Sequence, residues 1–158
     1  MVGHDAGQSG GGHSTAELIQ IMERMPFFTA LSAKDRSHLA RVGVERSYAA
    51  GEDIVRQGQE FVAMGLYIIL SGRVHVTQVG DDGRVQDLGQ FGPEQMFGEL
   101  ALLDDQPRSA TVTALEPTSA LVISIYDFRA TLSHNSEANV KLLAMLAERI
   151  RGAESTSQ

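Results

Sequence analysis

The chain of 158 residues is 42% hydrophobic and 21% charged, the composition of one globular domain large enough to bury its own core. It contains no cysteine, which excludes disulfides and thiolate metal sites, and its net charge of −7 argues against direct contact with nucleic acid, because phosphate binding needs clustered Lys and Arg. No apolar run approaches the roughly 20 residues of a membrane-spanning helix, and the first residues lack the basic and apolar regions of a secretory signal. We therefore expect a cytoplasmic protein that contacts no membrane.

The N-terminal part of the chain predicts a disordered lead-in followed by two helices. Residues 1–13 are rich in glycine and poor in apolar side chains, which is typical of disorder. Ser14 and Glu17 form a capping box, so a helix should begin at Ser14 and end at Pro26. Residues 32–35 repeat the capping signature and predict a second, short helix. The expected apolar faces are Leu18, Ile21, Met22 and Met25 in the first helix, and Leu39 and Val42 in the second.

Residues 44–124 have the texture of a β region. Short apolar segments alternate with glycines, and turn signals recur every eight to twelve residues, a spacing typical of a sandwich or barrel. Asp82 and Gly83 lie between two such segments and predict a hairpin turn. The clearest predicted strands are residues 66–70, 74–79, 84–88, 110–115 and 120–123.

The C-terminal part returns to helix. Ser124 and Asp127 form another capping box, and a last helix is expected over about residues 136–151, with a disordered tail over 153–158. The expected domain spans residues 14–152, divided into N-terminal helices (14–43), a β region (44–124) and C-terminal helices (125–152). Within the last helix a heptad-like set suits either a partner helix in a homodimer or the domain's own core. The set is Val140, Leu143, Ala147 and Ile150.

One segment, FGELALLDDQPRSA at residues 97–110, has a layout that can hold an anion. Gly98 precedes a short run of helix-forming residues, and a helix start presents free backbone N–H groups. Arg108 precedes a predicted strand and offers a planar fork for two phosphate oxygens. Glu99 would repel a phosphate unless it accepts hydrogen bonds from a nearby hydroxyl. The alternative is a surface ion-pair cluster of Glu99, Asp104 and Asp105 around Arg108.

The same segment resembles the phosphate-binding cassette of cyclic nucleotide-binding domains, of the type found in catabolite activators and protein kinase A regulatory subunits. The likeness extends over residues 18–151 and includes the segments MPFFTALS (25–32), AGEDIVRQG (50–58) and LYIILSGRV (66–74). It implies a mainly β fold with flanking α: an antiparallel β-roll, or jelly roll, with N-terminal helices and two C-terminal helices. One departure is Glu94, which stands where the family often has glycine, and here we expect a local change of turn.

The resemblance also implies roles for individual residues. Glu99 should accept from the ribose 2′-hydroxyl, and Arg108, helped by Ser109, should pair with the cyclic phosphate. Val76 and Leu88 should line an apolar wall against ribose and base. Ser109 after the arginine favours cAMP over cGMP. The remaining ligand-binding residues implied by the cassette are Gly98, Leu100, Ala101 and Ala110.

The function implied is a regulatory domain that senses the nucleotide and signals through its C-terminal helices to a protein effector. Two alternatives are a sensor module of a longer Crp/Fnr-like transcription regulator and a jelly-roll interaction domain without a ligand. A cupin-type metalloenzyme would need converging histidines, and no H-x-H pair exists, so we expect no catalytic residues, no metal and no cofactor besides the nucleotide. His75, in the β region, is expected to be an exposed strand residue; the others are His4, His13, His38 and His134.

Overall fold

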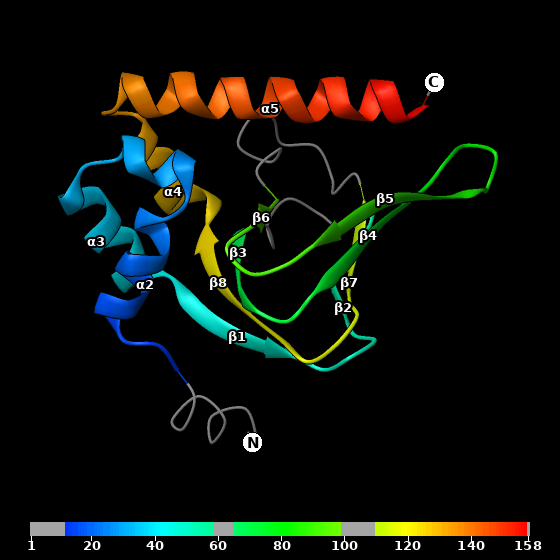
Figure 1. Cartoon of the computed structure of the whole chain (residues 1–158), viewed down its shortest axis with the longest axis horizontal. Helices are drawn as coiled ribbons and strands as arrows, with labels where there is room; N and C mark the ends of the chain where they lie inside the picture. Colours follow the sequence, from blue (N-terminus) through cyan, green and yellow to red (C-terminus); the bar gives the residue numbers. More distant parts are fainter. Residues whose placement is uncertain (1–11, 59–64, 99–109, 158) are drawn as a thin grey trace.

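The computed structural model describes residues 12–58, 65–98 and 110–157. Along the chain, helices precede and follow the strands, in the order that the sequence predicts. In space α2, α3 and α4 gather on one side of the strands (Figure 1). The elements are α2 (Thr15–Glu23), η1 (Pro26–Ala30), α3 (Ala33–Val42), β1 (Val44–Tyr48), β2 (Asp53–Val55), β3 (Gly65–Ser71), β4 (Val74–Val79), β5 (Val85–Phe91), β6 (Met96–Phe97), β7 (Thr111–Ala114), β8 (Thr118–Ser124), α4 (Ile125–Leu132) and α5 (Ser136–Ser157).

The described strands form two sheets with antiparallel pairing. One sheet has the order β1-β8-β3-β6 and the other β2-β7-β4-β5, so strands that are neighbours in a sheet are often distant in the chain. This arrangement confirms the predicted mainly β fold with flanking helices. The described strands lie between Val44 and Ser124. The hairpin at Asp82 and Gly83 is also confirmed, since β4 pairs with β5 and Gly80 N–H donates to the Arg84 carbonyl.

Strand β3 explains why residues 66–70 form an apolar run instead of an alternating one. Leu66 and Ile68 face a cluster built with the helices, whereas Tyr67 and Ile69 face a second cluster between the two sheets. A strand that is buried on both faces has no position for polar side chains. The two clusters make the core of the domain and place β3 at its centre.

The N-terminal helices begin where their caps predict. Ser14 caps α2 with the complete capping box, and Ser32 caps α3 by accepting from the backbone N–H of Asp35. Two details were wrong. Helix α2 ends at Glu23, and Pro26 instead opens the 3-10 helix η1, where its missing N–H costs nothing. In α3 the exposed Val42 does not share the buried face, which Leu39 and Ala40 form.

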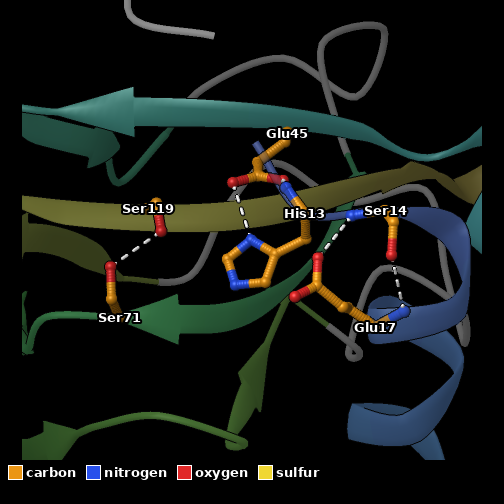
Figure 2. A network of polar contacts seen from close by, with 6 residues as sticks. All are labelled: His13, Ser14, Glu17, Glu45, Ser71 and Ser119. Atoms are coloured by element: carbon orange, nitrogen blue, oxygen red, sulfur yellow. Dashed lines mark hydrogen bonds and ion pairs between the residues drawn. The ribbon is translucent and has the colours of Figure 1, made fainter. Parts of the chain in front are cut away.

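The predicted lead-in includes His13, which the structure describes. His13 is held against β1: its backbone N–H donates to Glu45 Oε1 at 2.9 Å, and its Nδ1 lies 3.0 Å from Glu45 Oε2 (Figure 2). A carboxylate offering two oxygens orders this residue, which composition alone does not reveal. Residues 1–11 lie outside the described part of the chain. In the same view the hydroxyls of Ser71 and Ser119 lie 2.8 Å apart, joining β3 to β8.

The C-terminal helices cover one end of the β structure, and α5 runs across it as one long helix (Figure 1). Ser124 caps α4 as predicted, accepting from the backbone N–H of Asp127. Helix α5 continues to Ser157, beyond the predicted end near residue 151. The segment after Gly152 contains no proline, and a single glycine lowers helix stability by only about 1 kcal/mol.

In the part of the chain that the structure describes, no helix combines the length and the apolar character needed to cross a membrane.

Candidate functional site

An aromatic pair holds the described residue that precedes Gly98 of the candidate cassette. Tyr67 of β3 and Phe97 of β6 are register partners, and their rings stack with centroids 4.7 Å apart and planes 5° from parallel. Both side chains are buried, in the cluster between the two sheets. Phe97 is the last residue of β6, so this pair determines where Gly98 begins the next segment.

Gly98 has a left-handed backbone, with φ +92°. Side chains with a Cβ rarely adopt this conformation, because the Cβ crowds the following carbonyl. A glycine at this position therefore lets the chain turn sharply away from β6. This is the residue at which the predicted anion-binding segment begins.

The far end of the cassette returns to the same cluster. Ala110 packs against the inter-sheet core, and Thr111 then begins β7. The Thr111 hydroxyl accepts from the backbone N–H of Gln57, whose side chain exchanges two hydrogen bonds with the backbone of Val79 on β4. Gln57 thus joins the start of β7 to the end of β4. The role of Gln57 has no local sequence signal, because its partners are distant in the chain.

The two predicted wall residues differ in their surroundings. Val76 is buried in the inter-sheet cluster and pairs with Val112 of β7. Leu88 lies at a bulge in β5, where the register passes from Val76 opposite Gly89 to Thr77 opposite Asp87. Its side chain is 41% exposed and does not belong to the buried cluster. Bulges re-aim side chains beside functional sites.

Five of the predicted ligand-binding residues fall outside the described part of the chain. These are Glu99, Leu100, Ala101, Arg108 and Ser109. Of the four described residues of the prediction, Gly98, Ala110 and Val76 are brought to one region of the fold, because Phe97, which precedes Gly98, shares the inter-sheet cluster with the other two. The fourth, Leu88, lies outside that cluster.

His75 was expected to be exposed but is half-buried and paired. Its Nε2 lies 3.0 Å from Asp87 Oδ1, across the β4–β5 hairpin. The pKa of Asp87 is lowered, first by the backbone N–H of Gly89 and then by the hydrogen bond from His75. No group of three His, Cys, Asp or Glu side chains placed to hold a metal is found among the described residues.

The turn before β6 corrects another expectation. Glu94 keeps a left-handed backbone, with φ +66°, so the expected change of turn is wrong: the chain adopts there the conformation that a glycine would permit. Its carboxylate accepts from Arg24 at the end of α2, a contact between residues 70 positions apart that sequence reasoning missed.

Comparison with known families identifies the class of domain. The family described as cyclic nucleotide-binding domain matches residues 45–135, more than half of the chain. The chain therefore belongs to the cyclic nucleotide-binding domain family, and its β-roll with flanking helices is the fold of that family. The family consists of regulatory domains, not catalytic ones.

Individual relatives agree with this assignment. The chain is 31% identical over 133 residues to the cyclic AMP receptor protein of Thermus thermophilus, covering 84% of this chain and 61% of the relative. It is 40% identical over 95 residues to the cAMP-dependent protein kinase type II regulatory subunit of Drosophila melanogaster, covering 60% and 24%. The sensor domain of the transcriptional regulator DNR from Pseudomonas aeruginosa has the same fold, with a TM-score of 0.77 at 22% identity over 89% of this chain and 93% of that one. The chain thus spans 61% or less of the length of the two sequence relatives.

Proposed function

We propose that this domain binds cAMP, and cGMP more weakly, between β6 and β7, and that it works as a nucleotide-controlled regulatory domain without catalytic activity. The observation that carries the proposal is the anchoring of both ends of residues 99–109. Gly98 follows the stacked Phe97, and Ala110 returns to the cluster that contains Val76. The described residues on both sides of the cassette thus lie on one core, which suits a site for a small ligand.

Within this frame each cassette residue has a chemical role. Arg108 would bind the exocyclic oxygens of the cyclic phosphate through its planar fork, assisted by Ser109. The backbone around Gly98, Leu100 and Ala101 would donate to phosphate and ribose, and Glu99 would accept from the ribose 2′-hydroxyl. Val76 and Leu88 would contact ribose and base from the β4–β5 side.

The preference for cAMP is supported by two independent points. The relatives include one named as a cyclic AMP receptor protein and one as a cAMP-dependent kinase subunit. In this chain a serine, Ser109, follows the arginine, where threonine would favour cGMP.

Calorimetric titration of the full chain with cAMP and cGMP tests the proposal. Arg108→Leu should weaken binding by about 2–4 kcal/mol, roughly 30-fold to 1,000-fold in Kd, because the anion then faces an apolar side chain. Glu99→Ala should weaken the binding of cAMP, but it should affect the binding of 2′-deoxy-cAMP much less. The matched controls are Arg84→Leu, on a turn arginine with 90% side-chain exposure, and Glu116→Ala, on an exposed loop.

The outcome that contradicts the proposal is equally definite. If the wild-type chain binds neither nucleotide, or if Arg108→Leu and Arg84→Leu bind cAMP alike, the assignment of the site is wrong. Binding of neither nucleotide would leave a jelly-roll interaction domain as the better description.

Signalling would pass through α5, and a homodimer would be the assembly that transmits it. Ala138 and Leu142 bury one face of α5 against the domain, whereas Val140 and Leu143 are 65% and 58% exposed. Of the two interpretations of the heptad-like set, packing on the domain's own core is therefore wrong for these two residues. Ala147 is half-buried, and the side chain of Ile150 lies outside the described residues.

The wider setting of the domain is part of the same proposal. Two relatives are a cyclic AMP receptor protein and a kinase regulatory subunit. We therefore propose two settings: the domain acts on a protein effector, or it is the sensor module of a longer Crp/Fnr-like regulator. In either setting this negatively charged chain would work in the cytoplasm and would itself contact neither nucleic acid nor a membrane.

A further inference from the structure

Glu94 has a backbone conformation that its residue type disfavours. Among the described residues other than glycine, it alone has a positive φ, at +66°. The conformation is enforced by the turn. The Glu94 N–H donates to the Ile69 carbonyl at 2.8 Å, and the Ile69 N–H donates to the Gln95 carbonyl at 2.9 Å. A glycine would make the same backbone bonds without crowding its Cβ. The reason for a glutamate at this position must therefore lie in the contacts of its side chain.

The carboxylate of Glu94 joins this turn to the N-terminal helices. Its Oε2 accepts from Arg24 Nη2 at 2.6 Å and from Arg24 Nε at 3.0 Å. Arg24 is the C-terminal cap of α2, and its own backbone N–H donates to Ile21 and Met22. The pKa of Glu94 is lowered, mainly by the hydrogen bond from Arg24, which agrees with an ionised pair.

Glu94 stands where three parts of the fold meet. A groove of about 410 Å³ is lined from η1 and its N-cap, from the turn before β6, and from α5. Glu94 and Met96 line it on the turn side, and Lys141 and Met145 on the α5 side. Four residues after Glu94, the chain reaches Gly98, where the proposed nucleotide seat begins.

We propose that Glu94 is a positioning residue, whose ion pair with Arg24 couples the N-terminal helices to the turn that sets Phe97 and Gly98. The effect on nucleotide binding rests on the proposed function, whereas the coupling between helix and turn does not. An exposed ion pair contributes little to global stability, so the pair should be visible in local opening and in ligand affinity.

The test uses Glu94→Gly, because glycine keeps the left-handed turn and removes the side chain that carries the carboxylate. In the full chain without nucleotide, hydrogen exchange should rise over residues 24–30 and 92–97 in Glu94→Gly and in Arg24→Gln. The cAMP Kd should rise about two- to fivefold in each variant, and no further in the double variant. The charge-swapped variant, Arg24→Glu with Glu94→Arg, should recover part of both effects. Arg41→Gln is the control, since Arg41 is an exposed helix arginine bonded to Ser37.

The proposal is overturned if Glu94→Gly exchanges like the wild type over residues 24–30, or if the two single effects on exchange simply add. Failure of the wild-type chain to bind either nucleotide would refute the proposed function, while the exchange comparison would still decide the coupling. If hydrogen exchange rises in both single variants but their cAMP affinity is unchanged, the ion pair does not affect nucleotide binding, and that part of the proposal is refuted.

Discussion

Tyr67 and Phe97 stack face to face across the β3–β6 pairing, with ring centroids 4.7 Å apart. Strand β6 is only two residues long, and the ring contact adds to the backbone bonds that join it to β3. Stacked aromatic pairs contribute about 0.5–1.5 kcal/mol beyond the area that they bury. The stack therefore links the stability of the core to the position of Gly98.

Phe97→Ala should destabilise the domain and weaken nucleotide binding together. The side chain is 4% exposed, and removing a buried phenylalanine costs about 3–5 kcal/mol. Urea unfolding followed by circular dichroism measures the first effect, and calorimetry with cAMP at a temperature where the variant is folded measures the second. Tyr126→Ala, at a side chain that is 64% exposed, should change neither. A folded Phe97→Ala variant with wild-type affinity would show that this ring does not position the site.

Gly98→Ala should reduce cAMP affinity more than it reduces stability. At φ +92° an added Cβ costs roughly 1–2 kcal/mol, unless the backbone moves, and such movement would shift the cassette. The comparison is Gly51→Ala, since Gly51 has φ +87° in a turn away from the cassette and an added Cβ there meets nothing within 4 Å. Both variants should lose similar stability, but only Gly98→Ala should lose affinity. If the two variants bind cAMP with equal affinity, Gly98 does not belong to the site.

Elements specified by neighbouring residues could be predicted from the sequence. The caps at Ser14, Ser32 and Ser124 were found because a helix start depends on groups within three residues. The apolar run of β3 and the turn at Gly83 have the same local character. The cassette residues Glu99 and Arg108 were a different case: their spacing alone fits a surface ion-pair cluster, and only the family resemblance favours a site.

Contacts between surface side chains distant in the chain could not be predicted. His13 meets Glu45 across 32 residues, and Arg24 meets Glu94 across 70. Each is one ion pair among many that the composition permits, and no periodicity marks it. Leu88 shows a related limit, because the bulge that moves it out of register depends on how β4 and β5 pair, not on either strand alone.

The stability of the domain should fall steeply between pH 10 and pH 12, partly because of Tyr48. Burial raises the pKa of Tyr48 from 10.0 to about 12, with a smaller contribution from Tyr67. The folded state therefore holds this proton more tightly than the unfolded chain does. The resulting stabilisation is complete below pH 10 and is lost as the pH rises through the folded pKa. Tyr48→Phe should flatten this part of the curve of unfolding free energy against pH, measured by urea titration. Tyr126→Phe should leave it as in the wild type.

The exposed apolar pair on α5 makes the last prediction, that the chain forms a homodimer through this helix. Val140 and Leu143 lie three residues apart and so share one helix face, where a second copy could bury both. The wild-type chain should have twice the monomer mass in light scattering coupled to size exclusion, and Val140→Glu with Leu143→Glu should be monomeric, because association would bury unpaired carboxylates. Lys141→Glu alters an exposed residue of the same helix and should leave the dimer intact. Circular dichroism of the double variant establishes that it remains folded. A wild-type chain that is monomeric at 100 micromolar, or a double variant that still dimerises, would place the apolar pair outside any interface between copies.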